Sequence, residues 1–270
     1  MSGAGYARVV EIVEQLLAAS RPVARQHFRT PLAVTRKADC SPVTEADRAI
    51  EQAMKAVLQA EVPGHGILGE EFGLSGAEAR YIWVLDPIDG TKSFISGVPL
   101  FGTLIALLED GVPVLGVIDM PMLGETWIGQ RDGAGRVSTR FNGASCHAGR
   151  CTELSEAILF ATSPDQFTAQ ETRVFETLSA ACAARRFGGD CYSYGLLASG
   201  HIDLILEAEL QPYDYLALVP VVEGAGGVIT DWQGRALTLQ SSGQVLAAAT
   251  PALHAAALAR LAGKARAALP

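Results

Sequence analysis

Short apolar segments of strand length alternate along most of this chain with longer segments that have helical periodicity. Residues 81–85, YIWVL, are wholly apolar, which is typical of a buried strand. Near the N-terminus, Val9, Val13 and Leu16 recur at the spacing of one helix face. Because sheets and helices each bury one face against another element, this alternation predicts a layered α/β architecture.

Turn signals and apolar patterns predict the order of the elements. Asp110-Gly111 is expected to join two strands within 103–121 as a hairpin, and Asn142-Gly143 marks a further turn. Other strands are predicted at 81–85, 126–131, 157–162 and 201–209. Helices are predicted at 1–20, 44–60, 168–184, 192–200, 214–226 and 252–269, and 31–43 is predicted to be irregular. The pattern changes near residue 145, which predicts an N-terminal α+β half (1–145) and a C-terminal α/β half (146–270) that share an interface.

Composition excludes several classes of protein. Of the 270 residues, 49% are hydrophobic and 19% are charged, which excludes disorder for most of the chain. The formal net charge is −8, and the absence of a basic cluster argues against a nucleic-acid or anionic-membrane partner. Glu11 and Glu14 interrupt the first apolar segment, so it resembles an amphipathic helix and not a signal peptide. We therefore expect a soluble, cytoplasmic protein, in which bound cations supply positive charge for an anionic substrate.

The five cysteines are odd in number and irregular in spacing, which argues against a disulfide framework and favours a reducing cytosol. Cys146, His147 and Cys151 suggest zinc, but no second cysteine pair accompanies them. Buried or idle thiols are therefore the favoured interpretation.

The segment 83–94, WVLDPIDGTKSF, carries the strongest chemical signal. Asp86 follows a buried strand, and Asp89 comes three residues later, so a turn can direct both carboxylates to one place. Two carboxylates that close repel each other unless a cation lies between them, and oxygen ligands favour Mg²⁺. The amides of Gly90 and Thr91 can bind phosphate if a helix begins at Lys92. The alternative is an Asx-type turn with Asp89 as a helix N-cap.

Three further acidic positions each have an ordinary structural explanation. The Glu70-Glu71 pair can be a solvated acidic loop, Asp214 a plain N-cap, and Asp47 a capping-box partner of Thr44. Their joint occurrence in this order, with these neighbours, is not explained by three unrelated local structures.

The segment D-P-I-D-G-T-K-S-F (86–94) resembles the first signature of the inositol monophosphatase family of Mg²⁺-dependent, lithium-sensitive phosphatases. The upstream G-E-E (69–71), S-P-V-T-E-A-D (41–47), and the late Y-D (213–214) with E-G-A-G-G (223–227) fall where that family has its other motifs. The resemblance covers nearly the whole chain. It implies a layered α/β/α/β/α sandwich, a homodimer and two or three Mg²⁺ ions in each active site.

The resemblance also implies roles for single residues. Glu70, Asp86 and the carbonyl of Ile88 match the ligands of one metal ion. Asp86, Asp89 and Asp214 match those of a second, and Glu70 also approaches a third, weaker site. Asp47 and Thr91 match the pair that positions and activates the attacking water, which makes them catalytic together with Glu70. The amides of Gly90 and Thr91 match the phosphate-binding loop.

Two departures from the common family pattern concern the substrate. The usual W-D-x-A-A-G is Y-D-Y-L-A-L here (213–218), and the stretch before it resembles the histidinol-phosphate phosphatase branch. The resemblance implies substrate contacts from Gly188, Gly189, Asp190, Glu207 and Asp214. Asp190 stands where inositol phosphatases have a small neutral residue, and a carboxylate there can pair with the ammonium of histidinol phosphate. The alternative for Asp190 is a loop carboxylate in a Gly-Gly turn.

These observations predict a histidinol-phosphatase of histidine biosynthesis. Two alternatives remain: an inositol-1-monophosphatase or broad sugar-phosphate phosphatase, and a non-catalytic binding protein of the same fold. The last is disfavoured, because no matching metal ligand has been lost.

Overall fold

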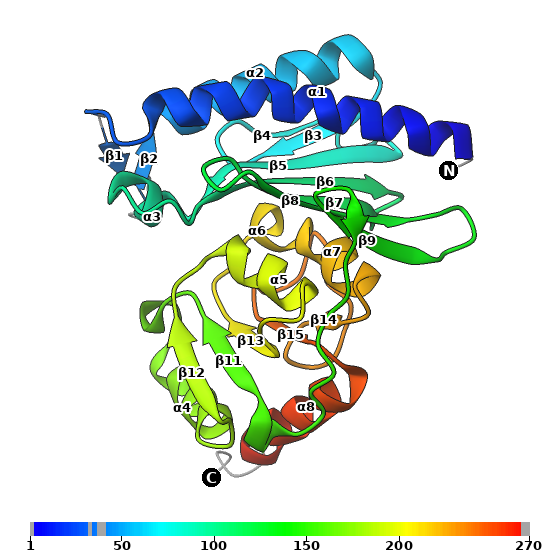
Figure 1. The fold of residues 1–270 in the computed structure, drawn as a ribbon. Coiled ribbons are helices and arrows are strands. Elements are labelled where there is room, and N and C mark those ends of the chain that lie inside the picture. Colours follow the sequence, from blue (N-terminus) through cyan, green and yellow to red (C-terminus); the bar gives the residue numbers. More distant parts are fainter. Residues whose placement is uncertain (1–2, 32–33, 37–41, 266–270) are drawn as a thin grey trace.

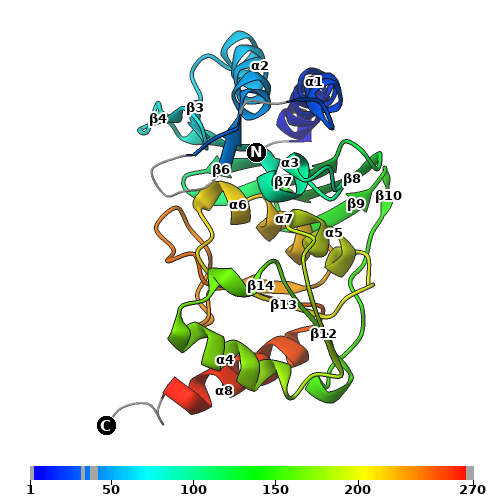
Figure 2. The same ribbon diagram turned by 90° about the vertical axis from the view of Figure 1, so that its left-hand side faces the viewer.

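The computed structural model describes residues 3–31, 34–36 and 42–265, and it has five layers (Figures 1 and 2). Helices α1 (Gly3–His27) and α2 (Glu45–Glu61) cover the outer face of an eight-stranded sheet. Helices α5 (Cys191–Ala198), α6 (Pro212–Tyr215) and α7 (Leu218–Gly224) lie between this sheet and a five-stranded sheet. The outer face of the second sheet is covered by α4 (Ala169–Ser179) and α8 (Pro251–Ala265). The predicted α/β/α/β/α sandwich is confirmed.

The larger sheet is antiparallel except for the parallel pair β3–β5, and its order is β10-β9-β8-β7-β6-β5-β3-β4. Its strands are β3 (Gly66–Gly69), β4 (Gly73–Ser75), β5 (Tyr81–Asp89), β6 (Gly102–Glu109), β7 (Val112–Met120), β8 (Glu125–Arg131), β9 (Val137–Phe141) and β10 (Ala144–Ser145). The smaller sheet has the order β12-β11-β13-β15-β14. Its strands are β11 (Ile158–Ala161), β12 (Ala184–Phe187), β13 (Leu204–Glu207), β14 (Val228–Thr230) and β15 (Val245–Ala248). Short elements complete the described chain: β1 (Val34–Arg36), β2 (Pro42–Thr44), α3 (Thr91–Ile95), and the 3-10 turns η1 (Leu154–Glu156) and η2 (Pro164–Gln166).

The two predicted tight turns form as expected. Asp110 and Gly111 have φ angles of 52° and 80°, and they connect β6 to its antiparallel partner β7. Asn142 and Gly143, with φ of 46° and 83°, connect β9 to β10. Left-handed backbone at both central residues matches the twist of the flanking strands, which is why Asp-Gly and Asn-Gly are favoured there.

Glycines on the larger sheet let the middle helix layer approach closely. A Cβ atom at Gly116 would lie 1.9 Å from the Ala217 carbonyl oxygen, and one at Gly129 would lie 2.2 Å from that of Pro220. The resulting core joins both sheets. It includes Ile118 of the larger sheet, Val221 of α7 and Ile205 of the smaller sheet. This packing fixes the height of α6 and α7 above the sheet.

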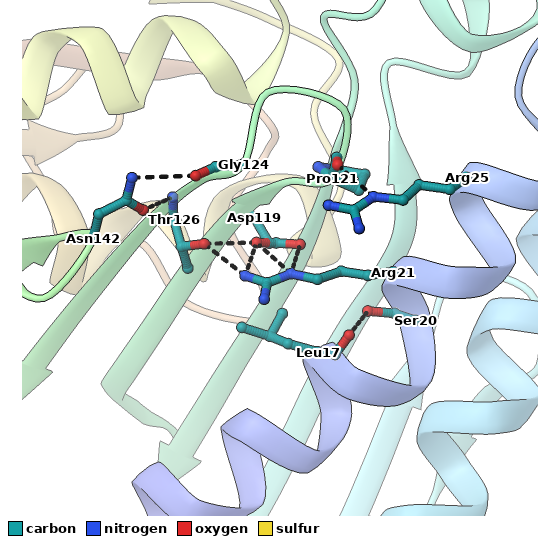
Figure 3. A network of polar contacts seen from close by, with 9 residues as sticks. All are labelled: Leu17, Ser20, Arg21, Arg25, Asp119, Pro121, Gly124, Thr126 and Asn142. Atoms are coloured by element: carbon teal, nitrogen blue, oxygen red, sulfur yellow. Dashed lines mark hydrogen bonds and ion pairs between the residues drawn. The ribbon is translucent and has the colours of Figure 1, made fainter.

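Helix α1 is held to the sheet by a partly buried ion pair, shown in Figure 3. The Arg21 guanidinium donates to the carboxylate of Asp119 on β7, with a shortest distance of 2.6 Å. Asp119 is only 1% exposed and also accepts from the Thr126 hydroxyl at 2.7 Å. The side chain of Arg25 donates to the Pro121 carbonyl one helical turn further on.

Several sequence predictions differ from the structure. The helix expected at 214–226 is two helices, α6 and α7, and the helix expected at 168–184 ends at Ser179, with β12 beginning at Ala184. Strands β3, β4, β9, β10, β14 and β15 were not predicted. Strand β1 lies within 31–43, which was expected to be irregular, and β2 begins there. Helix α1 continues through Pro22 to His27. The strands that were not predicted have only two to five residues, too few to show a clear period.

The division into halves at residue 145 stays a prediction. The chain passes from the larger to the smaller sheet between Ser145 and Ile158. Within the described residues, no helix combines the length and apolar character needed to cross a membrane.

Candidate active site

A bulge at the end of β5 places Asp86 and Asp89 on the same side. Asp86 pairs with Leu104 and Asp89 with Gly102, so β5 has one extra residue between these pairs. In a regular strand, residues three apart point to opposite faces, and a bulge changes that direction. Asp86 Oδ1 also accepts from the Ile88 amide at 3.0 Å. An Asx-type turn is therefore present and orients Asp86 within the cluster, but the N-cap of α3 is Gly90 and not Asp89, as the alternative expected.

Asp214 reaches the same place from the middle helix layer. It is the third residue of α6, where its Oδ2 accepts from the Gln211 amide at 2.7 Å. The carboxylates of Asp86, Asp89 and Asp214 lie within 4.8 Å of one another. The structure thus brings together all three predicted ligands of one metal site, although Asp214 is remote in sequence.

The electrostatics of this cluster show that it suits a cation. Burial raises the pKa of Asp86 well above its ordinary value, and the charges of Glu70 and Asp89 raise it further. Burial also raises the pKa of Asp89, with added effects of Asp190 and Asp214. The pKa of Asp214 rises to about 7, mainly through burial. Because all side-chain donors are carboxylate oxygens, the residues fit a hard divalent cation.

Glu70 lies beside this cluster on the loop after β3. Its amide donates to the Leu85 carbonyl at 3.2 Å, which ties the loop to β5. Its charge raises the pKa of both Asp86 and Asp214. The structure therefore brings Glu70 next to the three aspartates, as predicted.

Glu51 supports the Glu70 loop and was missed by sequence reasoning. This fully buried side chain of α2 accepts from the amides of Glu71 and Phe72 at 2.8 and 3.2 Å. A Cβ atom at Gly69 would lie 1.8 Å from Glu51 Oε1, so only glycine permits this contact. The available signal was a second acid one helical turn after Asp47 on the same helix face.

Asp47 and Thr91 each form hydrogen bonds with other residues and not with each other. Asp47 is 1% exposed and accepts from the Thr44 amide and hydroxyl at 2.8 and 2.6 Å, which forms the capping box of α2. Burial raises its pKa to about 6, and the nearby charges of Glu70 and Glu71 also raise it. The Thr91 hydroxyl donates to the Ile88 carbonyl at 3.1 Å. The water-positioning role of this pair stays a prediction.

A cavity of about 110 Å³ adjoins the aspartate cluster. Four carboxylates line it, from Asp89, Asp190, Glu207 and Asp214. The other lining residues are Thr162, Gln166, Cys191, Tyr194, Leu210 and Leu218. Of these six, none was predicted from the sequence, because they come from separate elements and carry no local motif.

Asp190 connects the cavity to the β5 loop. Its Oδ2 accepts from the Ser93 hydroxyl at 3.1 Å, and it would lie 2.9 Å from a Cβ atom at Gly90. The next amide, of Cys191, donates to Asp89 Oδ2 at 2.6 Å. Gly188 and Gly189, with φ of 99° and 108°, form the turn that delivers Asp190 to this place.

Glu207 lies deeper, at the end of β13, and is 2% exposed. It accepts from the amide of Thr162 at 2.9 Å, from the hydroxyl of the same residue, and from the Tyr194 hydroxyl at 3.1 Å. Burial raises its pKa to about 7. Glu207 and Asp190 thus make one wall of the cavity strongly acidic.

The described cysteines are free thiols at separate places. Cys146 donates to the Ala198 carbonyl and Cys151 to the Glu153 carbonyl, at 3.0 and 3.4 Å. Cys40 lies outside the described residues. Over the described ranges, the three aspartates form the one group of three or more candidate metal ligands, and Cys146, His147 and Cys151 form none.

The sequence model of the Inositol monophosphatase family matches residues 6–266. The chain belongs to the inositol monophosphatase family. It is accordingly a phosphatase.

Relatives within the inositol monophosphatase family carry different substrate names. The chain is 47% identical over 242 residues to "Bifunctional phosphatase IMPL2, chloroplastic" of Arabidopsis thaliana, covering 89% of this chain and 69% of that protein. It is 40% identical over 207 residues to a histidinol-phosphatase of Mycobacterium tuberculosis, covering 75% and 79%. The solved structure of an inositol monophosphatase from Zymomonas mobilis is 46% identical, with a TM-score of 0.86 over 95% of this chain and 98% of that one.

Proposed function

We propose that this phosphatase hydrolyses L-histidinol phosphate to L-histidinol and phosphate, a step of histidine biosynthesis. The observation that carries this proposal is the position of Asp190. Its carboxylate lines the cavity beside the aspartate cluster, together with Glu207. A primary ammonium on the substrate pairs with such a carboxylate by a charge-assisted hydrogen bond.

Asp190 is not needed to cap the helix that follows it. It occupies the N-cap position of α5 but makes no side-chain capping bond there. Its carboxylate turns instead toward Ser93, at the edge of the predicted phosphate-binding loop. This arrangement favours a role in recognition over the alternative of a plain loop carboxylate.

The metal-binding residues in this proposal are Glu70, Asp86, Asp89, Asp214 and the carbonyl of Ile88, holding two or three Mg²⁺ ions. A bound divalent cation neutralises phosphate charge and lowers the pKa of water. The amides of Gly90 and Thr91, where α3 begins, hold the phosphate oxygens. The hydroxyl of Thr91 and the carboxylate of Asp47 orient the attacking water, which requires Thr91 to exchange its contact with Ile88.

Inositol 1-phosphate is the second candidate substrate, and the name of the Zymomonas mobilis relative favours it. Polyol hydroxyls both donate and accept hydrogen bonds, so four carboxylates around the cavity do not exclude them. The carboxylates do not require a polyol either, whereas an amine forms charge-assisted hydrogen bonds with them. A non-catalytic protein is disfavoured, because every matching metal ligand is retained.

Phosphate release from histidinol phosphate and from inositol 1-phosphate, with Mg²⁺ and with EDTA, tests the proposal. We expect higher kcat/KM for histidinol phosphate and no turnover of either ester in EDTA. Equal or better turnover of inositol 1-phosphate would contradict the substrate assignment, and full activity in EDTA would contradict the metal requirement. We also propose a homodimer and a cytoplasmic location, and the mass of the protein in solution tests the first.

A further inference from the structure

Gln166 lies in the same cavity as Asp190 and Glu207, at the end of the 3-10 turn η2. The orientation of its amide group is set by a capping box. Gln166 Oε1 accepts from the Ser163 amide at 3.2 Å, while the Ser163 hydroxyl accepts from the Asp165 amide at 3.2 Å. The oxygen of the amide therefore faces the backbone of η2, which leaves the NH₂ group for another partner.

The NH₂ group of Gln166 differs from the other polar groups of the cavity. Thr162 and Tyr194 already donate their hydroxyl hydrogens to Glu207. The four carboxylates are acceptors when ionised. Among the hydrogen bonds of the described residues, Gln166 Nε2 has no acceptor, so it is the free side-chain amide donor of the cavity.

A neutral imidazole ring has one N–H donor and one unprotonated nitrogen that accepts. Such a ring is satisfied by a carboxylate on one edge and an amide donor on the other. Glu207 and Gln166 offer this pair in one cavity, and the apolar side chains of Leu210 and Leu218 line it as well. The ammonium of the same substrate has only donors, so it is matched by Asp190 and not by Gln166.

We infer that Gln166 is a specificity-determining residue that donates a hydrogen bond to the unprotonated nitrogen of the substrate's imidazole ring, which is bound in its neutral form. This inference rests on the proposed histidinol phosphate specificity. It assigns separate residues to the two nitrogen-containing groups of the substrate: Asp190 to the amine and Gln166 to the ring.

Gln166→Glu isolates the proposed donor, because the carboxylate keeps an acceptor for the Ser163 amide and replaces only the NH₂ group. It should reduce kcat/KM for histidinol phosphate by roughly 5- to 150-fold, the range for leaving a buried acceptor without its donor. Gln166→Met, which also removes the donor, should lose activity in the same direction. Gln170→Glu, an exposed change four residues further on, adds the same charge outside the cavity and should leave kcat/KM unchanged.

Three esters separate the possible outcomes: histidinol phosphate, a 2-aminoalkyl phosphate without the ring, and an imidazole-bearing alkyl phosphate without the amine. The Gln166 variants should lose activity on the two ring-bearing esters and keep it on the aminoalkyl ester. Equal losses on all three would show that Gln166 only shapes η2, and a gain for Gln166→Glu would show that the ring binds as a cation. Either result overturns the inference. Failure of the proposed function is seen independently, as wild-type enzyme that prefers inositol 1-phosphate.

Discussion

Asp190 has a backbone conformation that few residues other than glycine adopt, with φ of 45° and ψ of −136°. Such strain costs on the order of 1–3 kcal/mol and is retained where the side chain has a use. Two glycines precede Asp190, so the turn itself does not require a carboxylate at this position. The strain therefore supports a functional role for the side chain.

Asp190→Asn keeps the size of the side chain and removes its charge. It should reduce kcat/KM for histidinol phosphate by roughly 10- to 150-fold, as expected for a lost charge-assisted pair. A phosphate ester without the amine should be affected little, because the aspartate cluster is unchanged. The measurement is kcat/KM of both proteins on both esters. Equal losses would mean that Asp190 supports the loop or the metal ligands.

Thr91→Ala tests the water-positioning role. Removal of the hydroxyl should lower kcat by roughly 10²-fold with a smaller change in KM, because a positioned acid–base partner acts in the transition state. Thr91→Ser keeps the hydroxyl and should retain most of the activity. If KM rises while kcat is unchanged, Thr91 binds substrate or holds Ile88, and the assigned role is wrong.

Local sequence motifs predicted part of the active site. The other site residues are brought there by packing between elements that are remote in sequence. Asp86 and Asp89 were found from one segment, because the acids follow a buried strand. Asp214 was joined to them only through the family resemblance, since nothing local links α6 to β5. Glu51 was missed although it follows Asp47 by one helical turn, because that spacing is equally common on a solvated helix face. Gln166 was missed because a lone amide has no local pattern that marks it as a site residue.

At the scale of elements, the sequence predicted the helices and strands that have a local capping or turn motif or an apolar pattern long enough to show a period. The helix α2 begins at its capping Thr44, and the Asp110-Gly111 hairpin forms. The continuous apolar pattern over 214–226 concealed the break between α6 and α7. That break matters, because it directs Asp214 toward β5 while α7 packs on β7 and β8.

Gly116→Ala should disturb this packing. The added Cβ would lie 1.9 Å from the Ala217 carbonyl oxygen, so α7 must shift away from β7 and take α6 with it. We expect a loss of roughly 1–3 kcal/mol in the free energy of unfolding and weaker Mg²⁺ binding. Gly64→Ala is the matched control, because nothing lies within 4 Å of a Cβ atom there. Denaturant unfolding measures the first effect and Mg²⁺ titration the second. An unchanged Mg²⁺ affinity would show that the position of Asp214 does not depend on the packing of α7.

At the scale of the whole molecule, this acidic protein concentrates negative charge between its two sheets. Glu207 is buried and Asp214 is half-buried near the middle helix layer, and desolvation raises the pKa of each to about 7. A carboxyl whose pKa is raised by folding stabilises the folded state fully at pH below its unfolded pKa. That stability is lost as the pH rises through the folded pKa.

Without metal, the protein should therefore become less stable as the pH rises from about 4 to about 7, by at most about 4 kcal/mol from each carboxyl. Mg²⁺ binds the ionised carboxylates, so its stabilising effect should be larger at pH 8 than at pH 5. Urea unfolding at both pH values, in EDTA and in Mg²⁺, measures this difference. Asp214→Asn should reduce both the pH dependence and the Mg²⁺ effect, whereas Asp110→Asn, in the exposed hairpin, should change neither. A Mg²⁺ effect of equal size at both pH values would show that the cluster does not bind the cation through ionised carboxylates.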